Sequence, residues 1–297
     1  MEKAMIDDPL SSSIQIVVFL FLFTFLLSVA LEESKQEILT LMKSSLMGRS
    51  LLVNFILLPI LGLILIWLFR LPPEISVGFL MVAFAPGGML GLHFARVAKG
   101  NLAYVVGLIF LLSILSIVIT PTLIYLVFPS IAPSDGFVMS LLGRLLFFII
   151  PPFLVGQIVQ HWLPPIAPKL QKLSSFLSIV FFITLTVLTS RLKVLDTQAL
   201  SWNGLAAIAA FIGMSWFVGW QLGGPELANR KVLAISTSMR NVAICLLIAT
   251  SSVVNQNIEA TMLGFSALLT PMNLVFAISM SRIQPTTQRQ VKQADAD

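Results

Sequence analysis

The residues best suited to chemistry are polar side chains inside a long apolar segment, 232–253. Arg240 lies near its middle, accompanied by Ser236, Thr237, Ser238 and Asn241. A guanidinium in lipid costs at least about 2.5–3.5 kcal/mol, so its presence there marks a binding site or a pathway. None of the 13 Asp and Glu residues lies inside an apolar segment of this chain. Backbone carbonyls or an anionic ligand are therefore the expected partners of Arg240.

Two roles for Arg240 follow from these partners. In the first, it binds carbonyl groups at the end of a half-helix and holds the backbone together there. In the second, it contacts a substrate anion directly or through water, because a guanidinium offers paired donors to carboxylate, sulfonate or sulfate groups. The two roles are compatible, and the sequence leaves both open.

A second group of unusual residues interrupts another apolar segment, 75–95. The group comprises Pro86, Gly87 and Gly88, followed by Gly91, Leu92 and His93. Pro removes a helical hydrogen bond, and Gly weakens the preference of the backbone for helix. In lipid such a break survives only where protein or a water-lined cavity satisfies the freed groups; the alternative is a simple kink between packed helices. Three breakers together favour unwinding, and the polar run 236–241 predicts a second break.

The elements that must position these residues are transmembrane helices. The 297-residue chain is 57% hydrophobic and 10% charged, with a mean hydropathy of +0.97. These values exclude an ordinary soluble domain, whose charged fraction is about 25%. A run of about 20 apolar residues crosses a bilayer as a helix. The sequence predicts nine such spans, at roughly 11–31, 50–69, 75–95, 102–128, 137–163, 174–190, 202–222, 232–253 and 260–281.

The loop charges predict the orientation of the chain. Twelve Lys and Arg residues fall on one predicted side and four on the other, which places the C-terminus in the cytoplasm and the N-terminus outside. We therefore expect a single unit in the plasma (inner) membrane, residues 1–283, with a polar cytoplasmic tail, 284–297. The cations are spread over many loops, so the pI of 9.6 does not indicate nucleic-acid binding. Cys245 is the sole cysteine, and no Cys/His spacing resembles a metal site.

The two breaks lie in a repeated frame. A Thr-Pro pair lies in the span after each break, ending at Pro121 and at Pro271, and the distances Pro86–Pro121 and Ser236–Pro271 are both 35 positions. The broken spans are five helices apart, an odd number, so the two units run in opposite directions. This pattern is typical of an inverted-repeat transporter, whose substrate site forms where discontinuous helices meet. The predicted repeat has four spans in its first unit and five in its second.

Five motifs spread over nearly the whole chain carry a family resemblance. They are Asn54-Phe55 with Pro59, Ala85-Pro86-Gly87-Gly88, Ala98-Lys99-Gly100-Asn101, Thr120-Pro121 and Ser238-Met239-Arg240-Asn241-Val242-Ala243. Together they resemble the bile acid:sodium symporter family and its superfamily, which includes arsenite efflux carriers. The resemblance implies a core domain with two crossed broken helices, within about 50–128 and 202–281. It also implies a separate panel domain, within about 11–31 and 137–190.

The resemblance implies a first sodium site that this chain does not match. The family usually has Ser-Asn soon after Pro-Gly-Gly, where this chain has Gly91-Leu92. The next helix should offer hydroxyl groups, but the matching positions are Val105 and Ile109. Apolar side chains supply no oxygen ligands for a hard cation. The first sodium site is therefore expected to be lost.

The second sodium site implied by the resemblance differs even more. It normally uses a Glu and a Gln in the second broken helix and a Gln from an earlier helix. Their counterparts here are Ser236, Arg240 and Asn54. With the carboxylate absent and a guanidinium present, we expect a fixed positive group to occupy roughly the place of the ion. Sodium binding is disfavoured on this basis, and no other cofactor is expected.

The sequence thus predicts an all-α integral membrane protein that is a secondary transporter and not an enzyme. It moves a small organic anion by alternating access, without classical sodium coupling. Its expected partners are that anion and the bilayer, with no nucleic acid and no obligatory protein partner. The predicted substrate site comprises Asn54, Pro86, Gly87, Gly88, Gly91, Leu92, His93, Ser236, Thr237, Ser238, Arg240 and Asn241.

Other functions stay open at this point. Within transport, they are sodium-coupled symport of bile acid-like or other organic anions, and efflux of an oxyanion or metalloid. The alternatives outside the class of transporters are a channel and a membrane sensor. A channel would show flux without saturation, and a sensor would need a partner domain.

Overall fold

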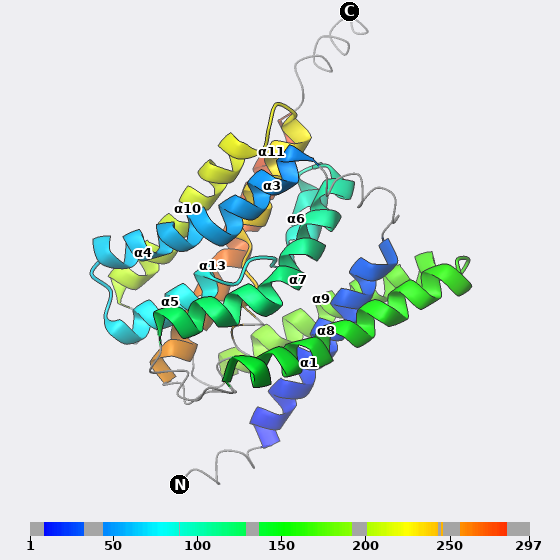
Figure 1. Cartoon of the computed structure of the whole chain (residues 1–297), viewed down its shortest axis with the longest axis horizontal. Coiled ribbons are helices and arrows are strands. Elements are labelled where there is room, and N and C mark those ends of the chain that lie inside the picture. Colours follow the sequence, from blue (N-terminus) through cyan, green and yellow to red (C-terminus); the bar gives the residue numbers. More distant parts are fainter. Residues whose placement is uncertain are drawn as a thin grey trace, which may run out of the picture.

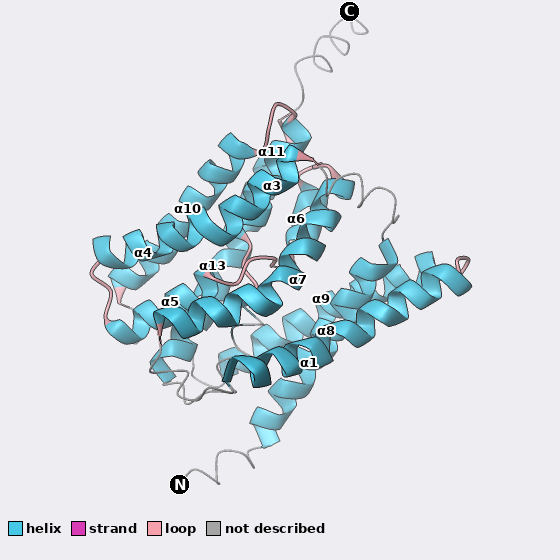
Figure 2. Cartoon of the chain, in the orientation of Figure 1, coloured by secondary structure: helices cyan, strands magenta, loops and turns pink. Residues whose placement is uncertain are grey.

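The computed structural model describes residues 9–32, 44–88, 90–128, 137–191, 201–242, 245 and 256–283, and within these ranges the chain is helical with short connections (Figures 1 and 2). The elements are α1 (Pro9–Glu32), α3 (Ser45–Leu52), η2 (Val53–Leu57), α4 (Leu58–Leu68), α5 (Pro73–Ala83), α6 (Gly91–Val97), α7 (Leu102–Val127), α8 (Phe137–Trp162), α9 (Ala167–Arg191), α10 (Trp202–Leu222), α11 (Leu227–Ser238) and α13 (Gln256–Ser281). The predicted tail, 284–297, lies outside the described residues.

Several helices are long and apolar enough to cross a membrane. Within the described ranges, Ser45–Leu68, Trp202–Leu222 and Ala260–Ser281 meet this condition on their own, and α7 meets it as two halves bent by 47°. The helix α10 has the predicted bounds, whereas α9 begins at Ala167 rather than at 174. The all-helical membrane architecture is confirmed, while nine spans in an inverted repeat stay a prediction.

The chain is unwound where the first break was predicted. The helix α5 ends at Ala83, and helical structure resumes only at Gly91 in α6. Gly87 has a φ of +91°, in the region that glycine adopts without steric cost. The second polar run also ends a helix: α11 stops at Ser238, and Met239 is extended, with a ψ of 120°. Residues 243–244 and 246–253 of the predicted eighth span lie outside the described residues.

A π-helical turn, η2, joins α3 to α4 and was not predicted from the sequence. Pro59 explains it, because a proline has no N–H to donate to the carbonyl of Phe55, four residues earlier. The wider turn contains Asn54, whose side chain is completely buried. Such turns occur often at functional sites.

The helices fall into two packed groups with α7 between them (Figure 1). In one group, α1 packs against α8 and α9: Phe21 and Phe182 lie with ring centroids 5.5 Å apart, and Gln157 donates to the carbonyl of Ala30 at 3.3 Å. In the other group, α3, α4, α5, α6, α10, α11 and α13 pack together. The main hydrophobic core runs through this group and α7 and reaches buried residues of α1, among them Phe21 and Phe25. The division into core and panel domains stays a prediction.

Candidate functional site

The two breaks cross and pair with each other through their backbones. Pro86 and Arg240 form an isolated antiparallel bridge, and the N–H of Asn241 donates to the carbonyl of Ala85 at 2.7 Å. Both unwound segments are buried. The freed backbone groups of one break are therefore satisfied in part by the other, which is how irregular backbone persists at membrane depth.

Gly88 permits this close approach. Its N–H donates to the carbonyl of Met239 at 3.3 Å. A Cβ at this position would lie 2.7 Å from both the backbone nitrogen and the backbone oxygen of Arg240. Only a residue without a side chain fits at this point of the crossing.

The helix that follows each break supports it with polar side chains. Behind the first break, Thr120 of α7 donates to the carbonyl of Phe84 at 2.8 Å, and Ser116 donates to the carbonyl of Pro86 at 3.1 Å. The Thr120 hydroxyl thereby gives the predicted Thr-Pro pair a structural role.

Behind the second break, Asn273 of α13 performs a similar role. Its side-chain oxygen accepts from the Ser238 hydroxyl at 2.5 Å and from the Trp216 indole at 3.0 Å. Asn273 was not predicted from the sequence, although it follows Ser238 by 35 positions, the spacing of the predicted repeat. Thr237 is also used by the scaffold, since its hydroxyl lies 2.9 Å from the carbonyl of Ser215 on α10.

The side chain of Arg240 points into the helix group around the crossing. It is only 2% exposed, and its guanidinium carbon lies 5.4 Å from the ring centroid of Phe211 on α10. Phe211 in turn packs edge-on against Phe79 of α5 and Phe265 of α13, at 5.5 and 5.6 Å. One face of the cation is thus covered by an aromatic ring, which attracts it electrostatically.

The edges of the guanidinium are left without hydrogen bonds. In the described part of the chain, neither Nε nor the two terminal nitrogens of Arg240 has a hydrogen-bond partner. The C-terminal ends of α5 and α11, at Ala83 and Ser238, lead directly into the crossing. Each such end carries about half a negative charge, which favours a cation there. The dipoles of these two helix ends therefore favour a positive charge at the crossing.

Two further buried atoms share this lack of partners. They are Oδ1 of Asn54 and Oγ of Ser236. Among the described residues, Nε of Arg230 is the only other buried side-chain nitrogen or oxygen that has no hydrogen-bond partner. Buried polar atoms without partners are rare in native proteins. All but one of them here belong to the three residues that the sequence places where the family's second sodium site would be.

The other predicted residues are placed as follows. Gly91 and Leu92 are buried at the start of α6, where a Cβ on Gly91 would lie 3.5 Å from Ile109 of α7. His93 is half-buried on α6, and no hydrogen bond among the described residues joins it to the crossing. Val105 and Ile109, where the family has hydroxyl groups, are buried.

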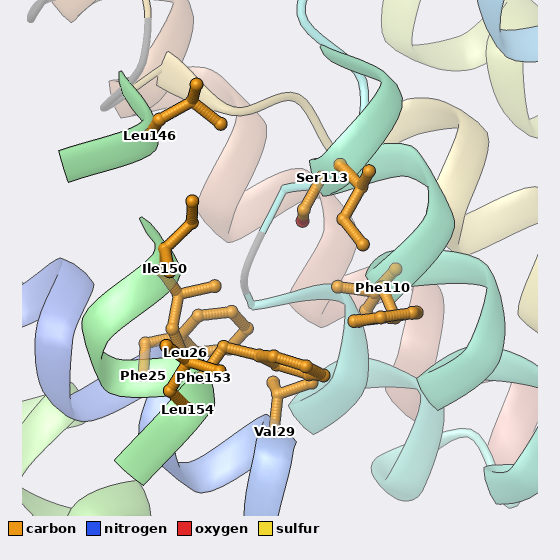
Figure 3. A pocket seen from close by; sticks show the side chains of 11 residues that line it. Phe25, Leu26, Val29, Phe110, Ser113, Leu146, Ile150, Phe153 and Leu154 are labelled. Carbon is orange, nitrogen blue, oxygen red and sulfur yellow. The ribbon is translucent and has the colours of Figure 1, made fainter. Parts of the chain in front are cut away.

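A separate apolar pocket of about 350 Å³ lies between α1, α7 and α8 (Figure 3). Phe110 of α7 and Phe153 of α8 stack in its wall with centroids 4.9 Å apart. Ser113 is its one lining residue with a polar side chain, and the Ser113 nitrogen lies 3.4 Å from a Cβ built on Gly87. The pocket therefore borders the first break, but it offers no charged group to an anion.

The chain matches a known protein family. The pattern that defines the Sodium Bile acid symporter family matches residues 15–197, more than half of the chain. The chain belongs to this family. The match includes Asn54 and the first break and ends before the second, so it does not cover Arg240. A family of transporters and the apolar helices together make the protein integral to the membrane.

Three relatives show how similar the chain is to individual transporters. Two are named probable sodium/metabolite cotransporter BASS3, chloroplastic: the Arabidopsis thaliana protein is 26% identical over 54% of this chain and 36% of its own length, and the Oryza sativa subsp. japonica protein is 23% identical over 67% and 48%. The third, from Bacillus subtilis (strain 168), is named uncharacterized sodium-dependent transporter YocS and is 26% identical over 67% of this chain and 63% of its own length. The chain thus spans less than two thirds of each of these relatives.

Proposed function

We propose that this protein is a secondary transporter that moves a small organic anion across the membrane by alternating access, without sodium coupling. The observation that carries the proposal is the buried guanidinium of Arg240 at the crossing of the two breaks. Its N–H groups have no hydrogen-bond partner among the described residues. A carboxylate accepts two parallel hydrogen bonds from such a group, which gives both energy and orientation.

The proposed substrate site surrounds this crossing. Arg240 supplies paired donors and Ser236 a hydroxyl, while Asn54 supplies an amide from the neighbouring span. Gly87 and Gly88 let the backbone approach closely, and Thr237 and Ser238 fix the end of α11. The site also includes Pro86, Gly91, Leu92, His93 and Asn241.

Arg240 also replaces the coupling ion in this proposal. Its charge lies where two helix ends provide negative potential, so it performs the electrostatic role that a bound sodium ion would otherwise have. A sodium ion about 4 Å from the guanidinium would be repelled by about 4 kcal/mol at an effective dielectric constant of 20. The proposal also takes the first sodium site to be lost, and the apolar, buried side chains of Val105 and Ile109 support this.

The transport cycle is proposed to follow from the two helix groups. The core, which contains both breaks, would rock against the panel of α1, α8 and α9 and expose the crossing to each side in turn. The proposed unit has nine spans in an inverted repeat in the plasma (inner) membrane, with the N-terminus outside and the C-terminus in the cytoplasm. The bilayer and the anion are its only proposed partners.

Sodium-coupled symport is the second candidate. The printed names of the relatives favour it, since they describe sodium/metabolite cotransporters and a sodium-dependent transporter. The oxygens without partners on Asn54 and Ser236 are also of the kind that coordinates a hard cation. The two candidates differ in one measurable property, the effect of a sodium gradient on uptake.

The test combines ligand binding with transport. Purified protein is screened by thermal shift against carboxylates and sulfonates, and the stabilising anions are then assayed for uptake into proteoliposomes with an inward sodium gradient or with potassium instead. We expect saturable uptake of equal rate in both cations. In Arg240→Gln, the apparent Kd should rise about tenfold or more, because a hydrogen bond to a charged group contributes about 1.5–3 kcal/mol.

Arg230→Gln is the matched control. Arg230 is also an arginine over an aromatic ring, 5.5 Å from that of Trp220, but it lies at the opposite end of α11 from the crossing. This variant should keep the affinity of the wild type. Uptake that requires sodium would overturn the proposal of transport without sodium coupling. Equal stabilisation of the wild type and Arg240→Gln by anions would overturn anion binding by Arg240. Flux without saturation would indicate a channel.

A further inference from the structure

We infer that the substrate is a hydroxycarboxylate, an anion whose hydroxyl group donates a hydrogen bond to Oδ1 of Asn54 while its carboxylate binds Arg240. This inference rests on the proposed function and names the substrate class of that same site. It follows from the kinds of hydrogen-bonding group that the site leaves without partners.

The donors of the site account for the carboxylate. The three guanidinium nitrogens of Arg240 and the hydroxyl of Ser236, four residues earlier, are all buried and have no hydrogen-bond partner within the described residues. A carboxylate has only acceptor atoms. It can therefore satisfy the guanidinium and accept from the hydroxyl as well.

Asn54 presents the opposite kind of group. Its amide nitrogen lies 2.9 Å from the backbone carbonyl of Ser50. A carbonyl oxygen only accepts, so the NH₂ group must face Ser50, and the amide oxygen must face the other way. That oxygen is buried and accepts from no donor among the described residues. The site thus has an acceptor as well as donors.

The acceptor is held in place by the residues around it. The hydroxyl of Ser50 donates to the carbonyl of Leu46 at 2.6 Å and lies 2.5 Å from the hydroxyl of Tyr104 on α7. Asn54 itself belongs to the π-helical turn η2. Because its NH₂ group is fixed to the same segment, the amide cannot rotate to offer a donor without losing that hydrogen bond.

A chain of contacts links the helix of Asn54 to the guanidinium. Gly62, on the same span, faces Phe79: a Cβ built on Gly62 would lie 3.8 Å from that ring. Phe79 packs edge-on against Phe211, and Phe211 covers the guanidinium of Arg240. At Gly62, eight residues after Asn54, the span that carries Asn54 therefore packs against the same aromatic cluster that covers the cation.

A simple carboxylate leaves this arrangement incomplete. It would satisfy Arg240 but would leave the Asn54 oxygen buried and unpaired, and two acceptors repel each other. A ligand hydroxyl supplies the missing donor. Sites built to hydrogen-bond a substrate hydroxyl reject the analogue that lacks it by up to about 10⁵-fold.

The experiment compares matched acids that differ by one hydroxyl group. The pairs are lactate with propionate and 2-hydroxyisovalerate with isovalerate, and their apparent Kd values are measured by calorimetry or thermal shift on the purified full-length protein. We expect the hydroxy acid of at least one pair to bind about tenfold or more tightly than its partner, because an unpaired buried acceptor is costly. This comparison uses the wild type, so it does not depend on the folding of any variant.

Variants assign the effect to Asn54. In Asn54→Leu the preference for the hydroxy acid should disappear, whereas in Asn101→Leu it should persist. Asn101 caps α7 at the opposite end of that helix from its Pro121 and hydrogen-bonds Asn229 at 3.0 Å, outside the proposed site.

Each remaining outcome contradicts the inference in a distinguishable way. If both acids of each pair bind equally to the wild type, the substrate class is wrong while anion transport stands. If the preference persists in Asn54→Leu, the hydroxyl is recognised elsewhere. If no carboxylate of either kind binds, the proposed function fails and this inference falls with it.

Discussion

At the scale of single residues, the closeness of the two breaks depends on the missing side chain of Gly88. The atoms that a Cβ would meet are the backbone nitrogen and oxygen of Arg240, at 2.7 Å. Backbone atoms in a paired segment cannot move aside as the tip of a flexible side chain can. The position of the Arg240 backbone, and with it the direction of the guanidinium, is therefore coupled to residue 88.

We expect Gly88→Ala to destabilise the protein by about 1–3 kcal/mol, the usual cost of overpacking a close-packed interior. Anion-dependent stabilisation should fall at the same time, because Arg240 must shift. Thermal unfolding in detergent, with and without the best-binding anion, measures both effects. Gly213→Ala is the control, since nothing lies within 4 Å of a Cβ there. A Gly88→Ala protein as stable as the control would show that the breaks are not tightly paired.

At the scale of elements, α7 acts as a support for the first break. Two of its hydroxyl groups reach carbonyls of the unwound segment, from Thr120 to Phe84 and from Ser116 to Pro86. These carbonyls have left the helical ladder at the end of α5 and have no water to bind at this depth. Removing one of these hydroxyl groups from α7 should therefore destabilise the first break rather than α7 itself.

Thr120→Val tests this role because valine has the same shape without the hydroxyl. The Phe84 carbonyl would lose its donor, which should cost about 1–2 kcal/mol of stability. Thr122→Val is a matched control two residues along the same helix, where the exposed hydroxyl donates to the carbonyl of Val118 within α7. Its thermal unfolding should differ from the wild type by less than about 0.5 kcal/mol. Equal effects of the two substitutions would contradict the supporting role of α7.

At the scale of the whole molecule, the orientation in the membrane is a prediction from loop charges. It places Arg70, between α4 and α5, outside, and Lys99, between α6 and α7, in the cytoplasm. Both side chains are exposed, and the native Cys245 is completely buried. Single cysteines at these two positions therefore give a clean test of sidedness.

On intact cells, a membrane-impermeant maleimide should label Arg70→Cys but label Lys99→Cys only after the membrane is permeabilised. The parent protein, with Cys245 alone, should stay unlabelled in both conditions and serves as the control. Labelling of Lys99→Cys alone on intact cells would invert the topology. The cytoplasmic assignment of the C-terminus would then be wrong as well.

The sequence predicted those features that depend on local chemistry. Pro86-Gly87-Gly88 interrupts its helix for reasons contained in the three residues, and the absence of acids from apolar segments left Arg240 without a carboxylate. The π-helical turn at Asn54 was missed, although Pro59 causes it, because a proline also permits an ordinary kink. Phe211 could not have been found, since any of many apolar residues can cover a cation once the helices pack. The same holds for the unpaired oxygen of Asn54, which depends on where Ser50 directs the amide.

The guanidinium at the crossing, unlike a dissolved ion, has no concentration. It cannot be diluted or depleted, and it carries no free energy from one side of the membrane to the other. Under the proposed mechanism, the direction of flow is then set by the anion alone, through its own gradient and the membrane voltage acting on its charge. Such a protein would work at the same rate in fresh water and in brine, and a cell that contains it would lose its anion whenever the interior held an excess.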